Sequence, residues 1–210
     1  MILPTTTLEQ QLWKQGFINV AGVDEAGKGP LAGPVTAGAV IIHKTQQTVD
    51  GVRDSKLMTE KQREKIFQTI CEQSTAFGIG IVSAEEIDFL GIDYAVKKAM
   101  LFALAELEHK LKSKLDYVIV DGAKTKELDI YNTQRILKGG LYHYSISAGS
   151  ILAKVTRDRI MREMNEQYPR YGFNDHVGYG TKKHMEAIKR FGPCPIHRKT
   201  FEPIRSLLRT

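Results

Sequence analysis

The strongest constraint on the fold is a pair of apolar segments near the N-terminus, joined by a loop rich in glycine and proline. The segments are FINVAGVD at 17–24 and PVTAGAVII at 34–42. Their alternation predicts two strands, and Gly33-Pro34 is a favourable turn before the second. Further strands are expected at 74–83 and 116–122, with a short one at 133–137. The first strand is predicted to end near Asp24, where two acids interrupt the apolar pattern.

Segments with helical spacing surround these strands. The clearest runs from 93 to 113, with an apolar stripe through Ala95, Ala99, Phe102, Ala103 and Leu107. Other helices are expected at 8–15, 54–73, 83–91, 147–168, 181–192 and 202–209, with loops at 171–180 and 193–201. This order predicts an α/β fold, in which a mixed sheet carries helices on both faces. We expect one domain over 1–210, with sheet and helices at about 16–168 and a helical C-terminal segment at about 169–210.

Composition narrows the functional class only slightly. The chain has 210 residues and a formal net charge of +6, which mildly favours a polyanionic partner such as nucleic acid. Its two cysteines, Cys71 and Cys194, have neither metal-binding spacing nor a disulfide framework. We find no signal peptide pattern and no run long enough to span a membrane. The expectation is a cytoplasmic, soluble protein with no membrane partner.

Two of the predicted strands end in an acid. Asp24 and Asp121 close apolar runs, and Glu25 follows the first of them. A carboxylate costs several kcal/mol to desolvate unless something compensates its charge. Three acids converging at a sheet edge would bind a hard divalent cation such as Mg²⁺ or Mn²⁺. The alternative is that each acid only caps a turn or helix, as Asp beside Gly often does.

Five segments, in this order along the chain, resemble motifs of bacterial ribonuclease HII, the type 2 ribonuclease H. They are GVDEAGKGPLAGPV (22–35), RDSKLM (53–58), VIVDG (118–122), SISAGSILAKVTRDRIM (145–161) and the C-terminal block from Tyr171 to Phe201. The resemblance spans about residues 16–205. It implies a ribonuclease H-like mixed five-stranded sheet flanked by helices, with a helical C-terminal segment, in a protein expected to be a monomer.

The resemblance also implies an activity. The family cuts the RNA strand of RNA–DNA hybrids, and it cuts 5′ of a ribonucleotide embedded in duplex DNA, leaving 5′-phosphate and 3′-hydroxyl ends. It uses two divalent ions, Mn²⁺ or Mg²⁺, held by four acids. Carried over by motif, the first three are Asp24, Glu25 and Asp121.

The fourth acid is missing at its usual place. In the family it follows Lys-Gly shortly before the long helix, and here the string LKGGLYHYSISAGS places Gly140 there. Asp129 and Asp158 are the acids nearby that could replace it. Asp158 is more readily explained by an ion pair with a neighbouring arginine. Three carboxylates would leave one positive charge of two divalent ions uncompensated, so weaker metal binding and lower activity are expected.

Recognition of ribose is expected from a loop and a tyrosine. The sequence Gly27, Lys28, Gly29 resembles the family's Gly-Arg-Gly loop, whose backbone approaches the nucleotide closely. Lysine keeps the charge of the arginine but loses its bidentate fork. Tyr179 matches the tyrosine that packs on the ribose and helps to sense the 2′-hydroxyl. Packing of Tyr179 on the core as a loop aromatic is the alternative.

The remaining basic residues are weaker candidates. Lys56 matches a family lysine near the substrate backbone, and Lys182, Lys183 and His184 open a helix from which they could reach phosphates. A solvated surface explains such lysines equally well. We expect His176, His184 and His197 to be structural or to face substrate, because their spacing is not that of metal ligands.

Two functions remain open from the sequence. The first is a metal-dependent endoribonuclease. The second is a homologue that binds hybrids with weakened or lost catalysis, since the fourth carboxylate is absent. Another ribonuclease H-like nuclease or a transposase is disfavoured, because the Gly27–Gly29 loop and Tyr179 both belong to ribonucleotide selection.

Overall fold

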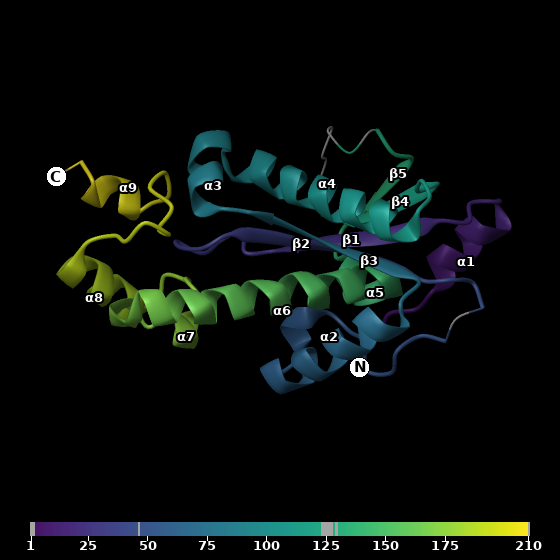
Figure 1. Ribbon diagram of the computed structural model, residues 1–210, viewed down its shortest axis with the longest axis horizontal. Coiled ribbons are helices and arrows are strands. Elements are labelled where there is room, and N and C mark those ends of the chain that lie inside the picture. Colours follow the sequence, from purple (N-terminus) through teal and green to yellow (C-terminus); the bar gives the residue numbers. More distant parts are fainter. Residues whose placement is uncertain (1–2, 46, 123–127, 129, 210) are drawn as a thin grey trace.

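A mixed five-stranded sheet forms the centre of the computed structural model, which describes residues 3–45, 47–122, 128 and 130–209 (Figure 1). The strand order is β3-β2-β1-β4-β5. β1 pairs antiparallel with β2, and β2 with β3, whereas β4 lies parallel to β1 and β5 parallel to β4. The strands are β1 (Val20–Ala26), β2 (Val35–Ile41), β3 (Ala76–Val82), β4 (Tyr117–Asp121) and β5 (Thr133–Ile136). The predicted mixed sheet is confirmed.

Helices cover both faces of this sheet. The long helix α4 (Ile92–Leu111) lies on one face, and α6 (Tyr144–Gln167) lies on the other beside α2 (Glu60–Gln73) (Figure 1). The C-terminal helices gather beyond one end of the sheet. The remaining helical elements are α1 (Thr7–Lys14), η1 (Ser55–Leu57), α3 (Ala84–Leu90), α5 (Gly139–Tyr142), η3 (Pro169–Tyr171), α7 (Phe173–His176), α8 (Lys182–Phe191) and α9 (Ile204–Leu207).

The register of the two central parallel strands aligns their acids. Val23 of β1 is paired with Val120 of β4, so the next residues, Asp24 and Asp121, lie at the same level on neighbouring strands. Side chains alternate along a strand, so residues two apart point to the same face. Gly22 lies two residues before Asp24 and Ile119 two residues before Asp121, and both positions are packed against α6. Asp24 and Asp121 therefore emerge side by side on the α6 face.

Close packing of α6 against the sheet brings this helix to the acids. A Cβ on Gly38 of β2 would lie only 2.3 Å from the carbonyl oxygen of Gly149 in α6. Glycine at both positions lets the two backbones approach more closely than side chains would allow. Ser150, the next residue of α6, consequently reaches the end of β1.

Four details differ from the sequence-based expectation. β1 continues past Asp24 to Ala26, because its antiparallel pairing with β2 outlasts its parallel pairing with β4. The helix expected at 54–73 is divided into η1 and α2, and α2 begins at a capping box on Thr59. The short helices α5 and α7 were not predicted. Phe102 is 46% exposed, outside the buried stripe, whereas Val96, Met100 and Leu104 join it.

The C-terminal segment packs onto the glycine-rich loop and onto α6. Tyr171, Phe173, Ile188 and Ile204 share a buried cluster with Leu31, Ala32 and Met161. The loop between β1 and β2 thus belongs to the same core as the last 40 residues or so. Among the described residues, no helix is long and apolar enough to cross a membrane.

Candidate functional site

The structure brings Asp24 and Asp121 together beside α5. Asp121 Oδ1 accepts a 2.9 Å hydrogen bond from the backbone N–H of Gly139, and its Oδ2 lies 3.5 Å from that of Gly140. Asp24 is 7% exposed, and its Oδ1 accepts a hydrogen bond from the Glu25 backbone N–H at 2.8 Å. The Ser150 hydroxyl also acts on this carboxylate and lowers its pKa, against the larger effect of burial. Each acid is therefore held by local donors while facing its neighbour.

Gly140 lies at the centre of this acidic group. A Cβ built on it would be 3.6 Å from Asp121 Oδ2, 3.7 Å from Asp54 Oδ2 and 3.8 Å from Asp24 Oδ2. Three carboxylate oxygens from three different segments thus surround one point. Gly140 is helical, without the positive φ that would favour glycine, and these distances are ordinary van der Waals contacts. Glycine is therefore not demanded here by backbone conformation or by space.

The electrostatics of the group favour a cation. Burial raises the pKa of Asp24 well above its usual range, and the charges of Glu25 and Asp121 raise it further. Burial also raises the pKa of Glu25, as does the charge of Asp121, although its hydrogen bond with Asp24 and the charge of Lys28 oppose this. A positive ion among these carboxylates would stabilise their ionised forms and reverse both shifts.

The donor chemistry fits a hard divalent ion. Carboxylate oxygens are the ligands that Mg²⁺ and Mn²⁺ prefer, and no soft ligand stands in the group. In the described part of the chain, no three acidic, histidine or cysteine side chains meet the geometry of a metal centre as they stand. Binding would therefore require the carboxylates to close inward by side-chain rotation. Asp24, Glu25 and Asp121 are the residues that would hold the ions.

Two buried arginines fix the loop between β1 and β2. Arg157 of α6 donates to the carbonyls of Pro34, Ala32 and Val177, each at 2.9 Å. Arg198 donates to the carbonyls of the same loop, at Gly27, Lys28, Gly33 and Pro34. Burial lowers the pKa of Arg157 to about 10 and that of Arg198 to about 9. These hydrogen bonds restrain the loop, and they use its backbone carbonyls as acceptors inside the protein.

The two glycines of the Gly-Lys-Gly loop have different reasons to be glycine. Gly27 has φ +95°, and a Cβ there would lie 2.2 Å from Arg157 Nε, so internal packing requires glycine. Gly29 is exposed, and the nearest atom to its Cβ position, within the described residues, is Tyr179 Cε1 at 3.9 Å. No described acceptor pairs with the backbone N–H of Lys28 or Gly29. Space and two outward donors are therefore available beside Tyr179.

Tyr179 lies across from this loop with an exposed ring. Its side chain is 46% exposed, and its ring centroid is 6.0 Å from the Arg157 guanidinium. The Tyr179 backbone is held at both ends, because its N–H donates to the His176 carbonyl and its carbonyl pairs with His184 Nδ1. The ring of Tyr179 is therefore partly exposed to solvent on a backbone that is held at both ends.

The other predicted candidates have distinct environments. Lys28 forms a 2.7 Å ion pair with Asp93 at the start of α4, and Lys56 is exposed in η1. Asp158 is buried and pairs with Lys154 at 2.6 Å and Arg63 at 3.6 Å, so its partners come from α6 and α2 and not from an adjacent arginine. Asp129 lies outside the described residues.

His184 is buried and cannot reach a phosphate from the start of α8, contrary to the expectation that it might. Its Nε2 lies 3.1 Å from His197 Nε2, and His197 Nδ1 accepts from the Cys194 backbone N–H at 2.9 Å. Burial lowers the pKa of both histidines to about 4. The histidines are therefore neutral structural links behind Tyr179. Lys182 and Lys183 are exposed, and Lys183 pairs with Asp175.

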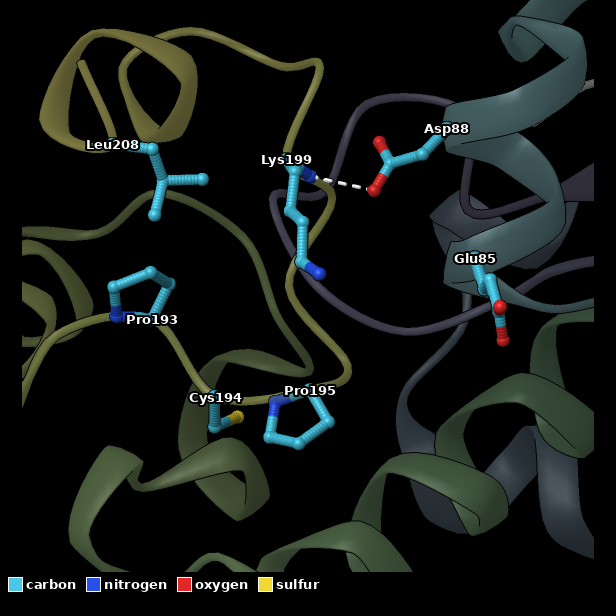
Figure 2. A pocket seen from close by; sticks show the side chains of 7 residues that line it. All are labelled: Glu85, Asp88, Pro193, Cys194, Pro195, Lys199 and Leu208. Atoms are coloured by element: carbon cyan, nitrogen blue, oxygen red, sulfur yellow. Dashed lines mark hydrogen bonds between the residues drawn. The ribbon is translucent and has the colours of Figure 1, made fainter.

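Figure 2 shows a pocket elsewhere on the molecule, between α3 and the C-terminal segment. Its lining residues are Glu85, Asp88, Pro193, Cys194, Pro195, Lys199 and Leu208. The Asp88 carboxylate accepts hydrogen bonds from the backbone N–H groups of Lys199 and Thr200, at 2.8 and 2.9 Å. The Asp88 carboxylate thus ties the C-terminal segment to α3, and the pocket is not lined by Asp24, Glu25 or Asp121.

The sheet order and the helices on both faces define a ribonuclease H-like protein. Ribonuclease H2 from Pyrococcus horikoshii OT3 superposes with a TM-score of 0.73 and 28% identity, over 90% of this chain and 97% of that one. Bst-RNase HIII, solved in complex with Mn²⁺, shares the fold with a TM-score of 0.65 at 17% identity, over 91% of this chain and 70% of that one.

Within that class, the chain belongs to the ribonuclease HII family, whose model matches residues 21–204. Ribonuclease HII of Acetivibrio thermocellus is 48% identical over 193 residues, which are 92% of this chain and 73% of the relative. Ribonuclease HII of Bacillus velezensis is 47% identical over 204 residues, 97% and 77% of the two chains. The resemblance predicted from the motifs is confirmed. The family consists of endonucleases with ribonuclease H activity on RNA–DNA hybrids.

Proposed function

We propose that this protein is a divalent-metal-dependent endonuclease that cuts RNA in hybrids and also cuts 5′ of single ribonucleotides in duplex DNA. The observation that carries the proposal is the group of carboxylates around Gly140, beside a rigid loop with outward backbone donors. The Mn²⁺ complex of a protein with the same fold supports the choice of cofactor.

The acidic residues would hold the metal ions that catalyse cleavage. Two divalent ions, when bound, would activate the attacking water and stabilise the leaving 3′ oxygen. Asp24, Glu25 and Asp121 would hold the ions, and the charges of Glu25 and Asp121 both act on the Asp24 carboxylate. Asp121 is oriented by the N–H groups of α5, and Asp24 by the Glu25 backbone N–H, so neither acid depends on substrate for its placement.

Selection of the ribonucleotide would fall to the loop and the tyrosine. The free N–H groups of Lys28 and Gly29 can donate to a phosphate or to the 2′-hydroxyl. The Tyr179 ring stands where a ribose could pack against it, 3.9 Å from the Cβ position of Gly29. Lys28, Lys56 and the exposed lysines of α8 would add phosphate contacts. In this proposal the C-terminal segment contributes to substrate binding within a monomer of one domain.

A second function is favoured by one observation, the glycine at position 140. Without the usual fourth acid, the chain could bind hybrids and embedded ribonucleotides with little or no cleavage. The two functions share every recognition contact, so binding data alone cannot separate them.

Cleavage of a defined duplex separates them. The substrate is a DNA duplex with one internal ribonucleotide, incubated with Mn²⁺ or Mg²⁺, beside an all-DNA duplex as control. We expect a single cut 5′ of the ribonucleotide, with none in the all-DNA duplex or in excess chelator. Tight binding of the ribonucleotide duplex without any cut in either ion would instead support the second function.

A further inference from the structure

Asp54, an acid from another segment of the chain, lies beside Gly140. Asp54 precedes η1, in the connection between β2 and α2, and its Oδ2 lies 3.7 Å from the Cβ position of Gly140. That distance falls between the corresponding values for Asp121 and Asp24. Three separate segments therefore direct carboxylate oxygens at the place where a side chain at 140 would begin.

The two carboxylate oxygens of Asp54 have different surroundings. Its Oδ1 accepts a 2.9 Å hydrogen bond from the backbone N–H of Lys56 and so caps η1. In the described part of the chain, no donor pairs with Oδ2. Capping needs only a neutral acceptor, which Asn provides equally well. The negative charge of Asp54 therefore has no explanation in the local turn.

A buried hydrogen bond fixes Asp54 relative to the other acids. Ser55, the next residue, is 4% exposed, and its hydroxyl lies 2.8 Å from the Ser150 hydroxyl. The Ser150 hydroxyl also acts on the Asp24 carboxylate, whose pKa it lowers. The hydrogen bond between Ser55 and Ser150 thus anchors the segment that carries Asp54 to α6 beside Asp24, which limits the movement of Asp54 relative to the other acids.

Asp158, one of the two acids considered from the sequence, is less suitable. The carboxylate of Asp158 is already occupied by Lys154 and Arg63. Asp54 Oδ2 instead lies, with Asp24 Oδ2 and Asp121 Oδ2, within 3.8 Å of the Gly140 Cβ position. Four carboxylates would balance the charge of two divalent ions, whereas Asp24, Glu25 and Asp121 alone would not.

We propose that Asp54 supplies the fourth carboxylate of the metal centre in this chain, from the β2–α2 connection in place of residue 140. This inference rests on the proposed function, because it assumes that the acidic group binds divalent ions. Asp54 would act as a direct or water-mediated ligand and would thereby compensate for Gly140.

The test measures Mn²⁺ binding directly, by calorimetry or by the loss of the free-ion electron paramagnetic resonance signal, without substrate. The variants are Asp54→Asn, Asp24→Asn, Asp50→Asn and the double variant Asp54→Asn/Gly140→Asp. Asp50 is the matched control, because it is exposed in the same connection and its substitution removes the same charge. Asp54→Asn should weaken Mn²⁺ binding about tenfold or more. Asp50→Asn should stay within about twofold of the parent, and the double variant should recover most of the loss.

A thermal measurement guards against a folding defect. Without metal, Asp54→Asn should melt no lower than the parent, because it keeps the cap of η1 and removes one of several clustered like charges. If Asp54→Asn binds Mn²⁺ as Asp50→Asn does while Asp24→Asn loses binding, Asp54 is only a cap and the inference is wrong. If Asp24→Asn also binds as the parent does, the proposed metal centre itself is wrong, which is a distinct result.

Discussion

Replacing Gly140 with aspartate should change how strongly the protein depends on metal. Because Gly140 is helical and its Cβ position has only ordinary contacts, the new side chain needs no backbone movement. The substitution would even gain a few tenths of a kcal/mol in helix propensity. Its main effect is therefore electrostatic, since it adds a carboxylate to a group that already holds those of Asp24, Asp54 and Asp121.

The magnitude follows from the distances. At an effective dielectric constant of about 20, two unit charges about 5 Å apart repel by about 3 kcal/mol. Protonation relieves part of this repulsion, because the pKa of Asp24 is already raised by burial and by its neighbours. We expect the metal-free variant to lose about 1–3 kcal/mol in its free energy of unfolding. Each kcal/mol should lower the melting temperature by about 2–4 °C. With metal bound, the added carboxylate should stabilise the protein instead of destabilising it. A tenfold gain in metal affinity would add about 1.4 kcal/mol to the free energy of unfolding at saturating ion.

The assay is thermal melting of the parent, Gly140→Asp and Gly140→Asn over a range of Mg²⁺ and Mn²⁺ concentrations, with cleavage rates measured under the same conditions. The Asn variant is the control, since it has the same size without the charge. The parent should favour Mn²⁺ over Mg²⁺, because Mg²⁺ tolerates irregular ligation poorly. Gly140→Asp should narrow that gap and respond more steeply to metal.

Two results would refute this reasoning. If a well-folded Gly140→Asp protein shows the same metal dependence as the parent, residue 140 does not face the ions. If the Asn variant behaves like the Asp variant, the effect comes from volume or polarity and not from charge.

Three further predictions concern substrate and pH. Tyr179→Ala should lower the rate at a single ribonucleotide by about a hundredfold while changing binding to plain duplex DNA little, and equal losses in both would make Tyr179 a structural residue. The logarithm of the hybrid-binding constant should fall linearly with the logarithm of salt concentration, by about 0.9 per phosphate contact, so that a flat dependence would argue against lysine and arginine contacts. His184 and His197 have folded pKa values of about 4 against an ordinary 6.5, so the unfolded chain binds more protons between these values. Stability should therefore be fully present above about pH 6.5 and fall as the pH drops towards 4, and a melting temperature that stays constant over this range would contradict their burial as neutral groups.

The strands and long helices were predictable because their patterns are local. β1 to β4 are apolar runs bounded by turn residues, and α8 begins and ends at the predicted residues, Thr181 and Gly192. The order of the strands was not predictable in the same way, because pairing of β1 with β4 joins segments almost 100 residues apart. The position of Asp24 beside Asp121 depends on that pairing, so spacing along the chain could only suggest it.

The site residues that the sequence reading missed are those whose role depends on distant partners. Asp54 belongs to the motif RDSKLM, from which only Lys56 was predicted to act, and its place beside Gly140 depends on the packing of η1 against α6. The signal available in the sequence was the missing acid at 140, which makes every acid in the motifs that resemble the family a candidate to replace it. Arg157 and Arg198 were not predicted to have a role, whereas each is buried and bonded to loop carbonyls. Backbone carbonyls belong to every residue type, so an arginine that is buried against them cannot be recognised from the identity of its partners in the sequence.

The central claim, that the acids around Gly140 form a working metal centre, is tested most directly with Asp24→Asn. The measurement is cleavage of a DNA duplex with one ribonucleotide by parent and variant, with Mn²⁺ and with Mg²⁺, alongside binding to the same duplex. Asn preserves the shape of Asp24 and removes its charge, so the variant should bind the duplex as the parent does. It should cut the duplex about a hundredfold to a thousandfold more slowly, or more slowly still, since a loss of that size is typical when a group that stabilises the transition state is removed. A folded Asp24→Asn protein that cuts at the parent rate would contradict the account.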